Sequence, residues 1–463
     1  MEAEARVVRQ ALHTGGSKKG KKKSSFLKGA AWIAAGGFIA KIIGALYRIP
    51  LTNLIGGHGL GLYQMVYPVY CMLLTVSATG IPSSIAKLTA ERIGKGESDR
   101  PLLKTSLKLF LVIGLLGGAL MAVIAPFLSK AQGSESVVGG YYALAPSVLL
   151  VSAISVFRGW FQGRNQMFPT AASEVTEQAV KVGFGLLFAY FFRANVEKAV
   201  VYLLLSVSIS ELVALLLMIA LFRRSSKGEK TANEGGRVAA KAILRLSIPV
   251  TFSSILLPLS GLLDSVLVPR FLSAYASDAV ALYGLFSGGA VTVINLPVSV
   301  CYGIAAASVP SVALEAAKEN GRPRKRILYA LLITILVSAP CAVGLYFFAE
   351  PAARIIFRSL QGEELQTLIE LIKAFSVSAL TLSCVQTMSA CLTAQGKPRY
   401  AALSMLIAIT VKTTIYVFLL RDSAISVFGL AYATNICYLV AFTFDLLYNL
   451  YVSRKRKPKE KET

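Results

Sequence analysis

Residues 28–48 read KGAAWIAAGGFIAKIIGALYR, a largely apolar run with cations at its two ends and one in between. A bilayer core of about 30 Å needs about 20 apolar residues in a helix. Lipid offers the backbone no hydrogen-bond partners, so such a run must be helical. Eleven further runs follow, at 62–86, 106–127, 141–162, 171–192, 199–222, 243–268, 281–308, 327–348, 368–392, 400–420 and 426–450. The sequence therefore predicts an all-α, polytopic integral membrane protein with about 12 transmembrane helices.

The composition agrees with a chain that lies mostly in lipid. Of its 463 residues, 55% are hydrophobic and only 16% are charged, against about 25% charged in soluble proteins. This excludes an ordinary soluble enzyme and a disordered protein. The net charge of +24 does not indicate nucleic-acid binding, because it is confined to short gaps between apolar runs. The six cysteines form no C-x-x-C pair and there are only two histidines, so no metal site is expected.

The distribution of lysine and arginine predicts the orientation. With both termini in the cytoplasm, the inner tails and loops hold 36 of these residues, the outer loops hold 8, and 4 lie within spans. This asymmetry is the one that the positive-inside rule expects. The sequence predicts a multi-pass protein of the cell membrane with both termini cytoplasmic. Its basic tails and loops would be anchored by membrane lipids of the anionic inner leaflet.

The longest polar loop follows the sixth run and divides the chain into equal halves. An even number of spans in each half predicts two lobes related by an axis along the membrane normal. The echo of Pro82-Ser83-Ser84 in Pro310-Ser311-Val312 gives weak support for a duplication. The expected organisation is a basic cytoplasmic tail at 1–27, an N-terminal six-helix lobe at 28–225, a cytoplasmic linker at 226–242, a C-terminal six-helix lobe at 243–451 and a basic cytoplasmic tail at 452–463.

Lys41 and Arg48 are the most informative charges within the runs. They lie seven residues apart in the first run, which is nearly two helical turns, so they share one face. We interpret this face as a cationic stripe that lines a cavity and binds an anionic substrate, a phosphate or pyrophosphate. The alternative is that Arg48 reaches the outer headgroups and Lys41 pairs with an acid on another helix.

The fifth run carries Glu174, Glu177 and Lys181 on one face, with Glu177 and Lys181 in the favourable i,i+4 order. They form either an internally neutralised structural stripe or a coupling or gating site. Glu211 in the sixth run and Asp264 in the seventh are further candidate coupling residues, because an intramembrane carboxylate can bind a cation or proton. Asp264 can instead pair with Arg270 or with Lys41.

Two residues of the C-terminal half complete the candidate site. Lys412, like Lys373, either lines the C-terminal half of the cavity or ends in a packing pair. Asn295 and Thr292 are the polar side chains of the stretch 292–297 in the eighth run. We take Lys412 and Asn295, with Lys41 and Arg48, as candidate substrate-binding residues.

Three sequence patterns resemble the stage V sporulation protein B family of the multidrug, oligosaccharidyl-lipid and polysaccharide exporter superfamily. They are Lys41-Ile-Ile-Gly44 to Pro50 with Gly59 to Pro68, Gly80 to Lys87, and Phe157-Arg-Gly-Trp-Phe-Gln-Gly163 continued by Pro169 and Glu174. The superfamily includes the MurJ-type lipid II flippases. The resemblance covers almost the whole chain and is strongest over 26–180.

The resemblance implies two six-helix lobes around a central cavity that works by alternating access. In the MurJ type, cations of the first helix contact the pyrophosphate, at about the places of Lys41 and Arg48. The sequence departs from the MurJ type in having no arginine within the apolar stretches of spans two and eight, and it has 12 spans where many relatives have 14. No enzyme and no cofactor are expected, since the chain has no GxxxxGK[ST] motif; membrane potential, sodium or protons would supply the energy.

Three functions follow as hypotheses. The first is a flippase for an undecaprenyl-pyrophosphate-linked glycan, whose partner is a lipid-linked oligosaccharide or a lipid II-like precursor for peptidoglycan, spore cortex or another surface polysaccharide. The second is a cation-coupled multidrug exporter, which would favour acidic residues in its cavity. The third is a membrane scaffold that recruits a synthase.

Overall fold

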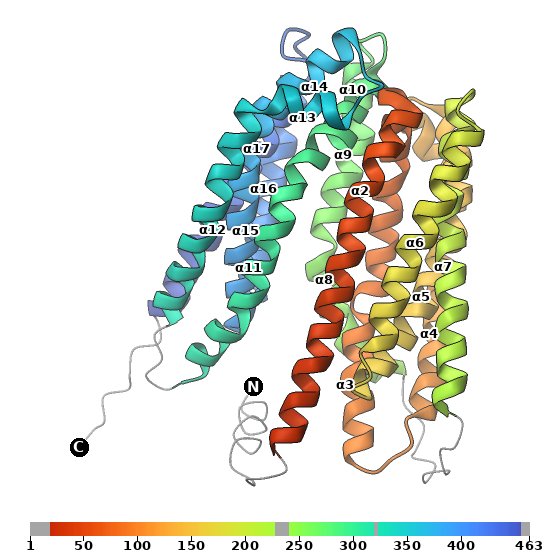
Figure 1. The fold of residues 1–463 in the computed structure, drawn as a ribbon, viewed down its shortest axis with the longest axis vertical. Helices are drawn as coiled ribbons and strands as arrows, with labels where there is room; N and C mark the ends of the chain where they lie inside the picture. Colours follow the sequence, from red (N-terminus) through yellow and green to blue (C-terminus); the bar gives the residue numbers. More distant parts are fainter. Residues whose placement is uncertain (1–18, 227–239, 319–322, 455–463) are drawn as a thin grey trace.

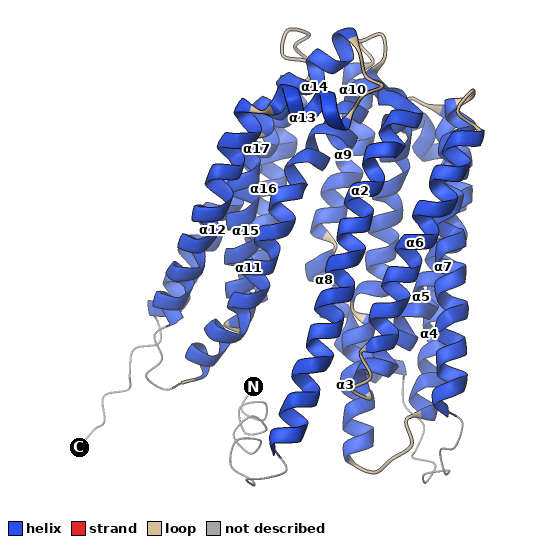
Figure 2. Cartoon of the chain, viewed as in Figure 1, coloured by secondary structure: helices blue, strands red, loops and turns tan. Residues whose placement is uncertain are grey.

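The computed structural model describes residues 19–226, 240–318 and 323–454. These ranges are helical with short connections and contain no strand (Figure 2). The side chains of some helical residues, among them Lys41, lie outside the described part. The prediction of an all-α membrane protein is confirmed.

The N-terminal bundle consists of α2 to α7. Its helices are α2 (Lys19–Leu74), η1, a π-helix (Thr75–Thr79), α3 (Ile81–Gly94), α4 (Arg100–Gln132), η2, a 3-10 helix (Glu135–Val137), α5 (Val138–Gly163), α6 (Phe168–Phe191) and α7 (Val196–Ser226). Helix α2 contains two arms, because Gly56 takes a left-handed φ of 66° that turns the chain between them.

Three short helices connect the bundles, and the C-terminal bundle follows. The connecting helices are α8 (Ala240–Ser254), α9 (Leu256–Leu272) and α10 (Ala279–Gly284). The C-terminal bundle contains η3, a π-helix (Leu285–Ala290), α11 (Val291–Ala317), α12 (Pro323–Phe347), α13 (Ala349–Ile356), α14 (Gly362–Phe375), α15 (Val377–Ala394), α16 (Pro398–Leu419) and α17 (Phe428–Arg454). Helix α9 contacts both α2 and α16, so it lies between the bundles.

Nine helical stretches in the described ranges are long and apolar enough to cross a membrane. The first, fifth and seventh predicted spans are helical but are not among these nine stretches, each for a different reason. The first arm of α2 includes residues outside the described part, and α6 carries the charges of the fifth run. The seventh span is divided into α8 and α9 at Ile255, because Pro258 has no N–H to donate to the carbonyl of Ser254. The fold thus has about 12 membrane-crossing arms.

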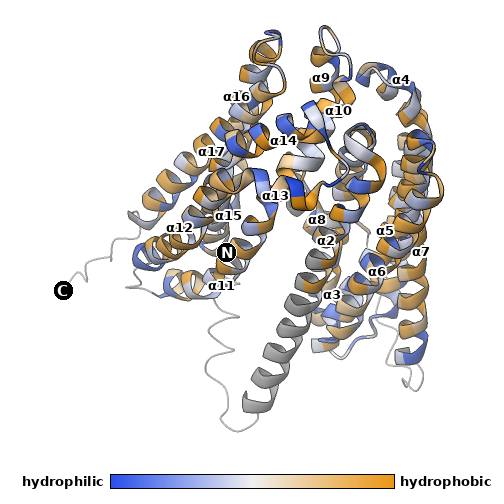
Figure 3. Ribbon diagram, turned by 45° about the horizontal axis from the view of Figure 1, so that its top comes forward, coloured by the Kyte–Doolittle hydropathy of each residue, from blue (hydrophilic) through white to orange (hydrophobic). Residues whose placement is uncertain are grey.

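The two bundles meet at one end of the molecule and diverge toward the other (Figure 1). Helices α10, α13 and α14 lie at the end where the bundles meet, which we call the closed end. The start of α2 and the end of α17 lie toward the opposite end. Large apolar side chains such as Leu116, Val123 and Leu336 are exposed on the helix shafts, as expected for surfaces that face lipid (Figure 3).

At the closed end the two halves touch backbone to backbone. A Cβ atom at Gly61 would overlap the carbonyl oxygen of Val280, and one at Gly284 would overlap the backbone of Gly57 and Gly61. Only glycine permits so close an approach of α2 and α10. The largest apolar core cluster also spans both halves, with Met65 and Tyr141 on one side and Phe286 and Phe375 on the other.

Candidate functional site

A cavity of about 340 Å³ lies between the bundles. Helices α2 and α6 form its wall on the N-terminal side and α11 forms its wall on the C-terminal side. The described residues that line it are Ala40, Gly44, Tyr47, Arg48, Leu51, Tyr63, Tyr67, Gln178, Lys181, Thr292, Asn295, Leu296 and Ser299. We call this space the central cavity. Among these described residues, Arg48 and Lys181 are cationic and none is acidic.

Arg48 joins the two walls of the central cavity. Its Nη1 donates a hydrogen bond to Oγ1 of Thr292, across 244 positions of sequence. The Thr292 hydroxyl in turn donates to the carbonyl of Gly288. Among the described residues Arg48 has no carboxylate partner, so its remaining guanidinium donors stay available to an anion.

Lys181 is the second cation of the central cavity. It is partly exposed there, and no described residue forms an ion pair with it. Gln178, one turn earlier on α6, also lines the cavity. On the opposite arm of α2, Tyr63 and Tyr67 stack with ring centroids 5.0 Å apart. A cavity with two cations, amide groups and aromatic rings can bind a phosphate beside a sugar.

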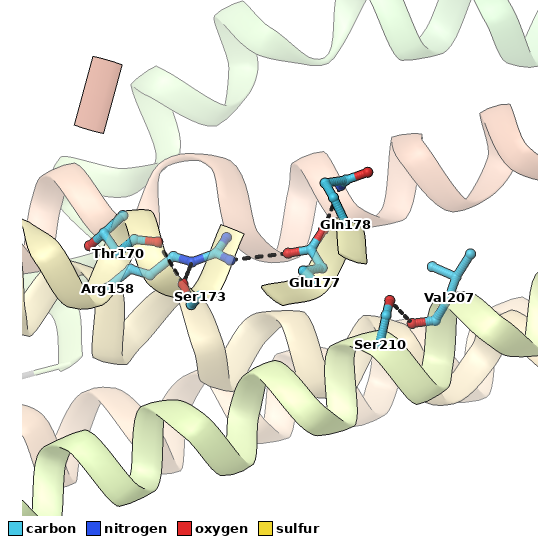
Figure 4. A network of polar contacts seen from close by, with 7 residues as sticks. All are labelled: Arg158, Thr170, Ser173, Glu177, Gln178, Val207 and Ser210. Atoms are coloured by element: carbon cyan, nitrogen blue, oxygen red, sulfur yellow. Dashed lines mark hydrogen bonds and ion pairs between the residues drawn. The ribbon is translucent and has the colours of Figure 1, made fainter. Parts of the chain in front are cut away.

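Glu177 interacts with Arg158 rather than with Lys181. Arg158 Nη2 lies 3.0 Å from Glu177 Oε2, and Arg158 Nε donates to Ser173 Oγ at 2.9 Å (Figure 4). The i,i+4 pair that the sequence favours is therefore not formed. The expectation of an internally neutralised stripe on α6 is therefore corrected. Arg158 of α5 forms the ion pair with Glu177, and Lys181 lines the cavity.

The other two acids of this region are buried or half-buried. Glu211 is only 4% exposed, and its Oε2 has no hydrogen-bond partner among the described residues. It interacts electrostatically with Glu177, Arg158 and Lys181. Glu174 is partly exposed and interacts electrostatically with Arg158 and Glu177. Both acids are therefore within electrostatic range of the Arg158–Glu177 pair, and neither lines the central cavity.

Lys412 and Asp264 form a separate buried ion pair. Lys412 Nζ contacts Asp264 Oδ2 and donates to Ser260 Oγ at 3.2 Å. Lys412 is 5% exposed and does not line the central cavity. Of the two alternatives for Lys412, the structure shows the packing pair and not a position beside Arg48. Asp264 pairs with this lysine of α16 and, among the described side chains, not with Arg270; Lys41, the other partner expected from the sequence, lies outside the described side chains.

Of the predicted substrate-binding residues, the structure brings Arg48 and Asn295 together in the central cavity. The side chain of Lys41 lies outside the described residues. Within the described ranges no group of histidine, cysteine or acidic residues is arranged to hold a metal ion.

Comparison with known families decides the classification. The sequence pattern of the family described as "Polysaccharide biosynthesis protein" matches residues 26–314, more than half of the chain. The chain belongs to the polysaccharide biosynthesis protein family.

Curated relatives of this family member agree with the resemblance drawn from its motifs. Stage V sporulation protein B of Bacillus subtilis (strain 168) is 27% identical over 355 residues, covering 73% of this chain and 68% of the relative. The lipid II flippase MurJ of the same organism is 24% identical over 451 residues, covering 90% of this chain and 82% of the relative.

Solved structures give the fold of the family member. An inward-facing multidrug resistance MATE family transporter of the MOP superfamily aligns with a TM-score of 0.76 at 16% identity, covering 91% of this chain and 96% of that one. A lipid II flippase MurJ in an inward closed conformation aligns with a TM-score of 0.70 at 14% identity, covering 92% of this chain and 90% of that one. An outward-facing MATE transporter of the superfamily aligns less well, with a TM-score of 0.66 at 17% identity. The family member therefore has the MOP-superfamily fold.

Sequence reasoning missed two features of the candidate site in this family member. Arg158 stands within one of the family motifs, and its sequence position does not reveal that it decides which charges of α6 remain free. The tyrosines of the second arm, Tyr63 and Tyr67, likewise stand within a motif. Their spacing of four residues places them on one face and was the signal available.

Proposed function

We propose that the protein is a flippase that moves an undecaprenyl-pyrophosphate-linked glycan precursor across the cell membrane by alternating access. The observation that carries the proposal is the positive charge of the central cavity, whose described lining residues include Arg48 and Lys181 and no carboxylate. Cations in a low-dielectric cavity attract an anionic head far more strongly than in water. The apolar surfaces of the helices leave the long lipid tail in the bilayer.

The conformation is consistent with a transport cycle. The bundles diverge toward the end at which α2 begins and α17 ends, and the fold aligns better with an inward-facing than with an outward-facing relative. We propose that both termini are cytoplasmic, so this state opens to the side on which lipid-linked precursors are made. The precursor would serve peptidoglycan, the spore cortex or another surface polysaccharide. Membrane potential, sodium or protons would drive the cycle, with Glu174, Glu177, Lys181, Glu211 and Asp264 as the candidate coupling or gating residues.

Native mass spectrometry with undecaprenyl diphosphate tests the proposal. Wild-type protein should bind the lipid, and Arg48→Ala, Lys181→Met and Lys41→Ala should each bind it more weakly. Arg193→Gln is the matched control, because Arg193 is an exposed arginine of the N-terminal half that stacks on Tyr190.

The alternative, a cation-coupled multidrug exporter, is favoured by the fold shared with MATE transporters. It predicts the opposite result in the same experiment. Binding of tetraphenylphosphonium without binding of undecaprenyl diphosphate would replace our proposal with it. Full lipid binding by all three variants would remove the central cavity as the head-group site.

A further inference from the structure

Three further cavities share wall residues between the central cavity and Arg358. The first holds only about 10 Å³ and shares Arg48, Thr292 and Leu296 with the central cavity. The second holds about 340 Å³ and shares Ile49 and Ile356 with the first. The third holds about 520 Å³ and shares Arg358 with the second. Shared walls place these spaces in series from Arg48 to Arg358.

The first of these cavities is a constriction. A space of about 10 Å³ holds no more than about one water molecule. Its walls include the Arg48–Thr292 hydrogen bond and the side chains of Ile356 and Phe357, the latter 1% exposed. A head group in the central cavity is thus separated from the closed end by the Arg48–Thr292 hydrogen bond and the apolar side chains that line this constriction.

Arg358 lies on the far side of the constriction and is free to bind an anion. It is exposed, and no described residue forms an ion pair with it. The neighbouring Arg354, in contrast, pairs with Glu350 at 2.9 Å. Arg358 lines both the second and the third cavity. Within the described ranges it is therefore the uncompensated cation of this route beyond Arg48.

The second cavity is apolar beneath this cation. Apart from Arg358 and Asn53, its lining residues are Ile49, Pro50, Ile355 and Ile356. Ile355 itself is an exposed large hydrophobic residue. A cation above an apolar slot suits a molecule with a phosphate at one end and a hydrocarbon chain at the other.

Asn53 positions the segment that carries Arg358. Its Nδ2 donates to the carbonyl of Ile356 at 3.0 Å, and its Oδ1 accepts from the backbone N–H of Ser359 at 3.0 Å. The Ser359 hydroxyl adds a bond to the carbonyl of Thr52 at 3.3 Å. The first arm of α2, which carries Arg48, therefore also holds the backbone on both sides of Arg358. Movement of this arm would therefore shift the positions of Arg48 and Arg358 together.

We infer that Arg358 is a second anion site, which receives the phosphate or pyrophosphate of the transported lipid once it has passed the Arg48–Thr292 constriction. The inference rests on the proposed flippase function and adds an anion-binding site on the exit side of the transport route. The head group would pass from Lys181 and Arg48 to Arg358 while its chain lies along the apolar slot. Arg358 should then affect release more than initial binding.

The test separates binding from transport. Binding of undecaprenyl diphosphate is measured by native mass spectrometry, and transbilayer movement of its fluorescent analogue is measured in proteoliposomes. We expect Arg358→Gln to bind within about twofold of wild type and to move the lipid about threefold to tenfold more slowly, since one charge-assisted contact is lost. Arg358→Lys should recover at least half of the rate, and Arg193→Gln should match wild type.

Three results would overturn the inference. The first is an Arg358→Gln protein that moves the lipid at the wild-type rate. The second is an equal loss in Arg193→Gln, which would indicate a general effect of outer charge. The third is loss of one bound phosphatidylglycerol from Arg358→Gln with transport intact, which would assign the site to a resident membrane lipid. A wild-type protein that neither binds nor moves undecaprenyl diphosphate would instead refute the proposed function, and the inference with it.

Discussion

Two intramembrane lysines, Lys181 and Lys412, have opposite surroundings. Lys412 is buried in the C-terminal half, where it contacts Asp264 and Ser260. Lys181 lines the central cavity, and no described residue forms an ion pair with it. The acid one turn away from Lys181, Glu177, pairs with Arg158 instead. The sequence presents both lysines as isolated cations in apolar runs, and only the fold distinguishes them.

The different surroundings of the two lysines predict that Lys412 affects protein stability and that Lys181 affects ligand binding. A charge in the membrane interior needs a partner or water. Lys412 has its partner within the chain, and this pair joins α16 to α9. Lys181 has a cavity, so a ligand can be its partner. The same residue type within an apolar run therefore supports two different measurements, one of unfolding free energy and one of lipid affinity.

Breaking the Asp264–Lys412 pair should have the largest effect. Asp264→Ala leaves a buried ammonium without a counter-charge, which costs about 3–5 kcal/mol of unfolding free energy. Thermal unfolding in detergent measures it. Asp264→Leu combined with Lys412→Met should restore most of the loss, because a well-packed apolar pair is often as stable as a buried ion pair. Equal instability of the double variant would contradict a charge-based explanation.

Removing the charge of Lys181 should leave stability nearly unchanged and weaken lipid binding. Lys181→Met loses one charge-assisted contact of about 1.5–3 kcal/mol, which corresponds to about tenfold to a hundredfold in the dissociation constant for undecaprenyl diphosphate. Native mass spectrometry gives the affinity and thermal unfolding gives the stability. Lys412→Met should show the reverse pattern, so matching profiles for the two variants would refute the comparison.

Replacing Arg158 should make the surroundings of Lys181 more like those of Lys412, by giving Lys181 a carboxylate partner. Arg158→Gln releases Glu177, which lies four residues before Lys181 and can then pair with it. We expect lipid affinity to fall about twofold to fivefold, since such a pair is weak. The double variant Arg158→Gln with Glu177→Gln should regain wild-type affinity. A persistent deficit in the double variant would mean that Arg158 acts directly.

The smallest expected effect is on protein stability, through the interaction of His58 and Asp278 at the closed end. His58 Nδ1 lies 2.8 Å from Asp278 Oδ2, and the two side chains are 42% and 45% exposed. This hydrogen bond lowers the pKa of Asp278 below its usual value. The contribution of this hydrogen bond to the stability of the folded protein is therefore fully present above the ordinary pKa of aspartate. It is lost as the pH falls through the lowered pKa of Asp278.

Asp278→Asn isolates this charge, because asparagine can still accept the N-cap hydrogen bond from Ala281 N–H. The variant should be less stable than wild type by about 0.5 kcal/mol or less at neutral pH. The difference should shrink toward about pH 3, below which an aspartate of ordinary pKa is mostly protonated. Melting temperatures of both proteins at the two pH values provide the measurement. A difference that grows toward low pH would show that the Asp278 charge does not stabilise the closed end.

Sequence reasoning recovered the parts of this molecule that depend on local pattern. Apolar run length predicted the helices, and Arg48, which the sequence singled out as a candidate substrate-binding residue, lines the central cavity. It did not recover pairings between distant segments. Lys412 lies 148 residues from Asp264, and Arg158 lies 19 from Glu177. The i,i+4 rule favoured Glu177 with Lys181, but a guanidinium from the neighbouring helix competed better because it makes a second bond to Ser173.

The glycine contact between α2 and α10 sets a limit on how evolution or engineering can adjust the closed end. Gly61 and Gly284 already carry the smallest side chain, and their backbones leave no room for a methyl group. Every substitution at either position adds volume, so it can act only as a wedge between the halves. Mutation at this contact therefore works in one direction, toward separation. A tighter closure has to come from the polar groups around it, which can be strengthened as well as weakened.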